Sequence, residues 1–139
     1  MTRTSKSNLV IDIINLQGKV QRRMSSALTP HGIGLTEYLV LHQLSLAPNQ
    51  SMRRIDLAER IGLSPSGITR LLNPMQKIGL IVKETNPRDA RVSLVALSSA
   101  GKRIYGEAAT SFAHASNTLL EAFDSKQVDA LQGLLVAAG

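Results

Sequence analysis

The feature that most constrains the fold is a tight turn between two short helical patterns, at Gly62, Ser64 and Pro65. Gly62 can adopt the left-handed conformation that commonly ends a helix. Ser64 is a good N-cap, and a proline at the first helical position loses nothing by lacking an amide hydrogen. Helical spacing of apolar residues precedes the turn from about Met52 to Ile61 and resumes after it. Two helices joined by so short a turn predict a helix-turn-helix.

The second helix of this pair divides into two chemically distinct faces. Its apolar face is predicted to carry Ile68, Leu71, Leu72, Met75 and Ile78, just as the first helix is predicted to bury Ile55, Leu57, Ala58 and Ile61. The opposite face carries serine, threonine, arginine, asparagine and lysine and has no acid. Such side chains contact phosphates and base edges, and a face without acids avoids repulsion from the DNA backbone.

This polar face predicts a DNA recognition helix, the alternative being an ordinary solvated face. The candidate contacts are Ser64, Ser66, Gly67, Thr69, Arg70, Asn73 and Lys77. Pro74 lies inside the same helix, where it removes the backbone bond to the carbonyl of Arg70. We therefore expect a bend near Asn73 and Pro74.

After Gly79 the pattern changes from helical to extended. Residues 80–82 and 92–97 are rich in β-forming side chains, and the polar segment 84–90 between them contains the turn dipeptide Asn86-Pro87. We predict a two-stranded hairpin beside the helix-turn-helix, which makes it a wing. Arg88, Asp89 and Arg91 at its tip are candidate DNA contacts, although a charged tip alone is equally typical of a solvated loop.

The charge of the chain supports the DNA-binding interpretation because of where it lies. The formal net charge is +6, and between Arg53 and Arg103 there are ten bases and four acids, whereas six bases and six acids cancel elsewhere. A basic excess confined to one region is the expected footprint of a surface that binds a polyanion. Arg53 and Arg54, at the start of the first helix, are candidate contacts to the DNA backbone.

Apolar stripes at helical spacing flank the basic region on both sides. A long amphipathic helix is predicted over residues 7–29 with Ser7 as its N-cap, a second helix begins with Thr36 as cap, and further helices occupy 102–137. The fold class is thus mainly α with a small β-hairpin wing. We predict a single domain over 1–139, with the winged helix-turn-helix at 36–101. The stripes on the outer helices suit either dimerisation or an intrachain core.

Other classes of function lack support in the sequence. There is no cysteine, which excludes disulfides and thiol chemistry, and the three histidines have no metal-ligand spacing. No phosphate-binding glycine loop or nucleophile elbow occurs, so we expect neither an enzyme nor a cofactor. No segment has the apolar length of a secretory signal or a membrane span, so a cytoplasmic protein without membrane partners is expected.

Three segments in this order resemble the MarR (multiple antibiotic resistance regulator) family of bacterial winged-helix transcription factors. They are DLAERIGLSPSGITRLL, the IGLI step into the wing, and RDARVSLVALSSAG, which is similar to the family's D-x-R wing tip followed by V-x-L-T-x-x-G. The sequence departs from this pattern at Asn86, where many members have an acid, at Ala90, where arginine is frequent, and at Ser98, which replaces the usual threonine.

The resemblance implies a homodimer, formed by the first helix and the last two, that binds a pseudo-palindromic operator in double-stranded DNA. It places the helix from Ser64 in the major groove and Arg91 in the minor groove, with Asp89 holding Arg91 by an ion pair. It also implies a repressor released by a small aromatic or anionic effector. Candidate effector-binding residues are Arg22, Arg23, His31, Tyr38 and His42.

Two alternatives remain open at this point. One is a DNA-binding protein that needs no effector, since an isolated histidine or tyrosine is usually a structural residue. The other is a winged-helix module that binds proteins, which would require exposed apolar anchors on the second helix. The polar side chains predicted for that face favour DNA.

Overall fold

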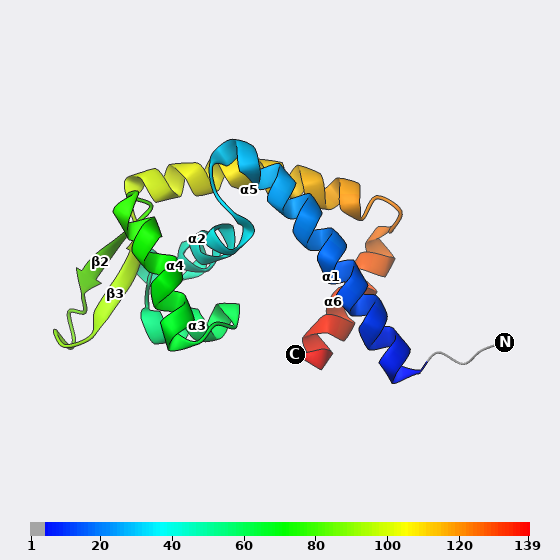
Figure 1. Cartoon of the computed structure of the whole chain (residues 1–139), viewed down its shortest axis with the longest axis horizontal. Coiled ribbons are helices and arrows are strands. Elements are labelled where there is room, and N and C mark those ends of the chain that lie inside the picture. Colours follow the sequence, from blue (N-terminus) through cyan, green and yellow to red (C-terminus); the bar gives the residue numbers. More distant parts are fainter. Residues whose placement is uncertain (1–4) are drawn as a thin grey trace.

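The computed structural model describes residues 5–139 as a chain of helices with one small sheet (Figure 1). The elements of the N-terminal half are α1 (Lys6–Leu28), η1 (Thr29–His31), α2 (Leu35–Leu46), η2 (Pro48–Gln50), β1 (Ser51–Arg53) and α3 (Arg54–Ile61). Those of the C-terminal half are α4 (Pro65–Lys77), β2 (Ile81–Thr85), β3 (Ser93–Leu97), α5 (Ser99–Leu119) and α6 (Ser125–Ala138).

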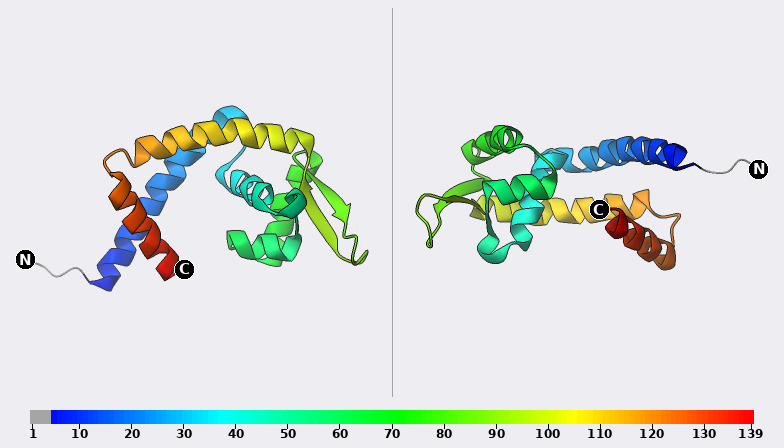
Figure 2. Two further views of the ribbon diagram at one scale, coloured as in Figure 1. Left: turned by 180° about the vertical axis from the view of Figure 1, so that it is seen from behind. Right: turned by 90° about the horizontal axis from the view of Figure 1, so that it is seen from below.

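The chain separates into a winged unit, residues 35–97, and an arm formed by α1, α5 and α6. In Figure 1 the wing lies at one end of the molecule and the beginning of α1 toward the other, while α5 extends along the top from the wing to the loop that precedes α6. The helices α1 and α6 overlap in that view but lie apart when the molecule is seen from below (Figure 2).

The sheet has three antiparallel strands in the order β1-β3-β2. Strand β3 pairs with β2 from Ile81↔Leu97 to Thr85↔Ser93, and with β1 from Ser51↔Ala96 to Arg53↔Leu94. The predicted two-stranded hairpin was therefore incomplete, because residues 51–53 form a third strand, of which Met52 and Arg53 were predicted as the beginning of a helix. Helix α3 accordingly begins at Arg54.

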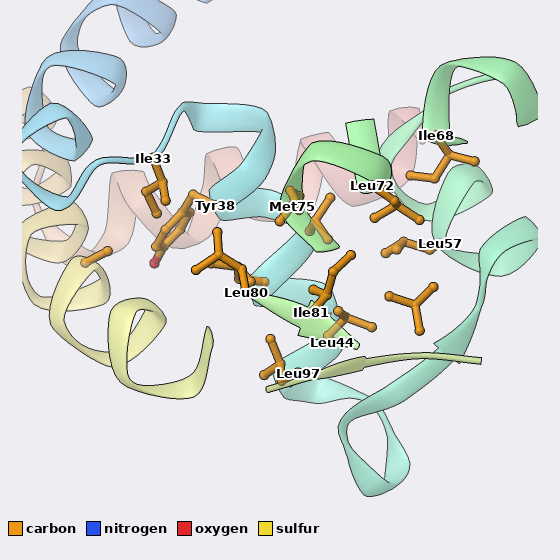
Figure 3. Packing of buried hydrophobic residues seen from close by; sticks show 14 of the residues in the cluster. Ile33, Tyr38, Leu44, Leu57, Ile68, Leu72, Met75, Leu80, Ile81 and Leu97 are labelled. Carbon is orange, nitrogen blue, oxygen red and sulfur yellow. The ribbon is translucent and has the colours of Figure 1, made fainter. Parts of the chain in front are cut away.

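The hydrophobic core belongs almost entirely to the winged unit. Leucines of α2, α3 and α4 meet Ile81 and Leu97 of the sheet and Leu80, which directly precedes β2, as Figure 3 shows. The arm contributes few core residues, among them Leu28 at the end of α1 and Ala108 in α5. No residue of α6 is buried, and the only buried residues of α1 are Met24 and Leu28.

The local signals that define the helix-turn-helix are confirmed. Gly62 ends α3 with a φ of 75°, in the left-handed region, and the Ser64 hydroxyl accepts a hydrogen bond from the amide of Gly67 at 3.0 Å. Pro65 is the first residue of α4. Helix α4 is continuous through Pro74.

Two predicted caps were each wrong by two residues. The hydroxyl of Ser5, not Ser7, caps α1 by accepting from the amide of Asn8. Helix α2 is capped at Gly34, not Thr36, and the Glu37 carboxylate accepts from the Gly34 amide at 2.7 Å. In both cases a polar side chain still binds a free amide of the first turn or of the residue before it.

Two apolar residues predicted to face inward are exposed. Ile55 is 62% exposed because it lies about 160° around α3 from the fully buried Leu57, although only about 60° from Ala58. Ile78 is also 62% exposed because α4 ends at Lys77, so helical spacing no longer places its side chain.

Candidate nucleic-acid interface

Helix α4 presents the polar face that its sequence predicted. Ile68, Leu72 and Met75 are buried, whereas Ser66, Thr69, Arg70, Asn73 and Lys77 are all exposed. The Ser64 hydroxyl, besides capping the helix, lies 3.2 Å from the hydroxyl of Ser66. The exposed face contains no carboxylate, so its hydrogen-bond donors stand free to meet anionic groups.

The start of α3 lies beside this face and brings two arginines to it. The Arg54 guanidinium approaches the Thr69 hydroxyl at 3.5 Å, a contact that joins α3 to α4. Arg53 instead binds Asp56 with two hydrogen bonds of 2.9 and 3.2 Å. This pairing lowers the pKa of Asp56 and raises the pKa of Arg53, in each case chiefly through the side-chain hydrogen bond between them.

The wing tip is a set of short turns tied by side chains. The Asn86 carboxamide oxygen accepts from the amide of Arg88 at 2.9 Å, and Asp89 accepts from the amide of Arg91 at 3.0 Å. The carboxylate of Asp89 also accepts from the Arg91 guanidinium at 3.1 and 3.3 Å. The hydrogen bond from this guanidinium is the main cause that lowers the pKa of Asp89, followed by the bond from the backbone amide.

The ion pair expected between Asp89 and Arg91 therefore forms, and its geometry directs the Arg91 side chain. That side chain is 90% exposed although its guanidinium is held on one side by the carboxylate. It borders a hollow on the wing that is also lined by Lys83, Glu84, Thr85, Ala90 and Ser93. Arg91 is thus oriented without being covered, which leaves its remaining donors available for another anion.

An open groove connects the start of α3 with the wing. Arg53, Arg60 and Arg88 all line it, together with Ala47, Pro48, Ser51, Met52, Asp56, Glu59 and Leu94. Arg53 and Arg88, both predicted as DNA contacts, are thereby brought to one surface. Arg60 was missed, although its position four residues after Asp56 on the same helix could have indicated that it shares this side.

The five candidate effector residues do not come together in one place. Tyr38 is buried, its ring stacked 4.5 Å from that of Phe112, and burial raises its pKa to about 12. His42 shares a 2.7 Å hydrogen bond with the hydroxyl of Tyr105, and His31 shares one of the same length with Ser111. All of these partners lie on α5, and the sequence alone did not point to them.

Arg22 and Arg23 lie elsewhere, on the exposed side of α1. With Lys19 and Ser26 they line a shallow hollow of their own. The structure thus separates the predicted effector residues into a packed aromatic and imidazole cluster against α5 and a cationic hollow on α1.

Two further classes of site find no support within residues 5–139. No three His, Asp or Glu side chains gather in a way that would hold a metal ion. None of the helices in this range combines the length and the apolar character required to cross a bilayer.

Known proteins are similar to this chain in sequence and in structure. A sequence profile described as "MarR family" matches residues 31–92. The HTH-type transcriptional regulator YhbI of Bacillus subtilis is 23% identical over 116 residues, which cover 84% of this chain and 74% of YhbI. The transcriptional repressor MdtR of Bacillus subtilis is 26% identical over 95 residues, covering 68% of this chain and 60% of MdtR, less than two thirds of that relative.

A solved structure of similar fold includes nucleic acid. It is a mutant MarR from E. coli crystallised with operator DNA, which superposes with a TM-score of 0.82 at 21% identity and covers 97% of this chain and 99% of that one. The agreement extends over the arm as well as the winged unit, because nearly the whole of each chain is aligned.

Proposed function

We propose that this chain, of which residues 31–92 match a MarR family profile, is a winged helix-turn-helix transcriptional regulator that binds a pseudo-palindromic operator as a homodimer. The observation that carries the proposal is the exposed, acid-free face of α4. In this arrangement α4 enters the major groove, and Arg70 and Asn73 contact base edges while Ser64, Ser66, Gly67, Thr69 and Lys77 bind mainly phosphates.

The wing and the start of α3 extend the contact to the flanking DNA. Arg91, oriented by Asp89, enters the minor groove, where a narrow groove concentrates negative potential and attracts arginine. Arg88 lies on the same tip, and Arg53 and Arg54 bind the phosphate backbone beside α4. The groove shared by Arg53, Arg60 and Arg88 supports a continuous phosphate-binding surface between helix and wing.

The homodimer is supported by the apolar side chains that the arm leaves exposed. In α1 they are Leu9, Val10, Ile11, Ile13, Ile14 and Leu16, and in α6 they are Val128, Leu131, Leu134, Leu135 and Val136. Contiguous apolar surface of this extent is rare on monomeric proteins and marks an interface. A second copy covers both helices, and a two-fold axis then presents the two winged units to two half-sites.

We further propose that the protein is a repressor released by a small anionic or aromatic ligand. The name of the relative MdtR, a transcriptional repressor, supports repression. The cationic hollow formed by Lys19, Arg22, Arg23 and Ser26 supports an anionic ligand, because three bases border it and no acid does. Regulation without any effector is the alternative.

The experiment is a titration of the protein against DNA from its own upstream region at several salt concentrations. A protein that neutralises six or more phosphates loses about 10³-fold in affinity between 50 and 200 mM salt. We expect such a loss, and a preference for upstream DNA over a scrambled duplex. Weak binding that does not change with salt would contradict the proposal. The same titration with benzoate-type acids present tests the effector: release of DNA supports it, and unchanged binding favours effector-independent regulation.

A further inference from the structure

The first contact between α5 and the winged unit is a joint at Ser98, where α4, the wing and α5 meet. The Ser98 hydroxyl donates to the carbonyl of Gly79 at 2.5 Å and accepts from the amide of Gly101 at 2.9 Å. The Ser98 amide donates to the carbonyl of Leu80 at 3.2 Å. A Cβ at Gly101 would lie 2.0 Å from that same carbonyl oxygen, so the first turn of α5 rests directly on the backbone that leaves α4.

Two further hydrogen bonds join α5 to the winged unit and to the end of α1. The Tyr105 hydroxyl lies 2.7 Å from His42 Nδ1 on α2, and the Ser111 hydroxyl lies 2.7 Å from His31 Nε2 on η1. Phe112, the residue after Ser111, stacks on Tyr38. Ser98, Tyr105 and Phe112 follow at seven-residue intervals, close to two helical turns, and therefore lie along one side of α5.

The hydrogen bonds fix the orientation of α5, which apolar packing alone does not. Burial of apolar surface is non-directional and tolerates a small rotation or slide of one helix on another. A hydrogen bond weakens steeply when its angle or length changes. The three ties bind α5 to three different elements, the α4–β2 corner, α2 and η1, so that no single rotation of α5 preserves all of them.

We propose that Ser98 and Tyr105 are positioning residues that fix the angle between the winged unit and the arm, and so set which half-site spacing the dimer accepts. The inference rests on the proposed dimeric operator binding. The arm carries the exposed apolar surface that joins two copies, whereas α4 lies at the far side of the joint (Figure 1). A change of angle at the joint therefore moves the two recognition helices relative to each other without altering either.

The first test uses DNA with altered half-site spacing. Tyr105→Phe keeps the ring that packs 5.4 Å from Tyr38 and removes only the hydroxyl. We expect the variant to bind a single half-site as the parent does, while its discrimination against operators with one or two added base pairs falls about tenfold. Ser98→Ala should lose discrimination in the same way as Tyr105→Phe. Ser98→Thr, which retains the hydroxyl, should discriminate between spacings as the parent does.

A matched control lies on the same helix. The Ser116 hydroxyl donates at 2.7 Å to the carbonyl of Phe112, within α5, and forms no tie to the winged unit. Ser116→Ala should therefore leave the spacing preference unchanged. If Tyr105→Phe and Ser98→Ala discriminate between spacings as well as the parent, the proposal is wrong.

The second test measures the joint without DNA. The sequence has no cysteine, so Gln76→Cys, at an exposed position of α4, accepts one spin label per chain. Electron-spin distance measurements on the dimer should give a narrow distribution in this background and a broader or shifted one when Tyr105→Phe is added. No coupling in the labelled background would refute the dimer, whereas coupling with an unchanged distribution in the double variant would refute the joint.

Discussion

The carboxylate of Asp89 orients the Arg91 side chain, and it does so only while it is ionised. Because its folded-state pKa is depressed below the ordinary 3.8, the pair contributes stability fully above that value and loses it as the pH falls through the lowered pKa. The ion pair is therefore intact throughout the neutral range. In the proposed complex Arg91 therefore meets DNA already oriented, and that orientation does not depend on pH under physiological conditions.

Replacing Arg70 or Arg91 by alanine is expected to change DNA binding in different ways. Arg70→Ala should lose discrimination between operator and scrambled DNA by about 10- to 100-fold, since a bidentate base contact is worth roughly 1–3 kcal/mol. Arg91→Ala should weaken binding most at operators with narrow-groove flanks. Competitive gel shifts with matched flanks measure both effects.

Arg70→Lys is the matched control for this comparison. It keeps the positive charge but not the planar fork, so it should retain the salt dependence of the parent while losing discrimination. Parent-like binding by both alanine variants would overturn the proposed docking of α4 and the wing.

At the scale of elements, the sequence predicted those parts whose signals are local. The turn from Gly62 to Pro65 and the wing turn at Asn86 are determined by residues that stand next to each other, and both are where they were predicted. Strand β1 was not predicted because residues 51–53 contain one apolar side chain, and only pairing with β3, more than 40 residues later, makes them a strand.

The candidate site divides in the same way. The exposed side of α4 follows from helical spacing and was predicted from it. The partners of His31 and His42 did not follow from spacing, because Ser111 and Tyr105 lie 80 and 63 residues away and no local pattern marks them. His31 and His42, which were predicted to bind an effector, instead form hydrogen bonds to α5.

The apolar side chains of α6 give a prediction at this scale. Val128, Leu131 and Leu135 follow helical spacing along one side of α6, and Leu135 is 56% exposed in the single chain. Leu135→Lys would place a charge in the proposed dimer interface and should weaken dimerisation by about 100-fold or more. Analytical ultracentrifugation over a range of concentrations measures this loss.

The control changes another side of the same helix. Gly133→Lys adds the same charge about 165° away from the centre of the Val128–Leu135 stripe, where an added side chain meets no other atom of the chain, and should leave the dimer intact. If both variants dissociate equally, or if neither dissociates, this stripe of α6 is not the interface.

The molecule consists of a winged unit with its own hydrophobic core and an arm that has almost none. The winged unit holds nearly all of the core and carries eight bases against five acids, half of the net charge of +6, whereas the N-terminal part of α1 and all of α6 bury nothing in the single chain. Helices that bury no apolar face have little stability in water. In the proposed homodimer the arm is completed by a second copy, and the arm sets the relative positions of the winged units.

This dependence predicts a thermal stability that rises with protein concentration. Association stabilises the folded chain by mass action, so the Tm of the parent should increase over a hundredfold range of protein concentration, as followed by circular dichroism at 222 nm. In Leu135→Lys the increase should disappear, and helical signal should be lost in an early phase, from α1 and α6, before the winged unit melts. A parent Tm that is independent of concentration, together with a monomer in the ultracentrifuge, would contradict the division of the molecule into a self-sufficient winged unit and an arm completed by its partner.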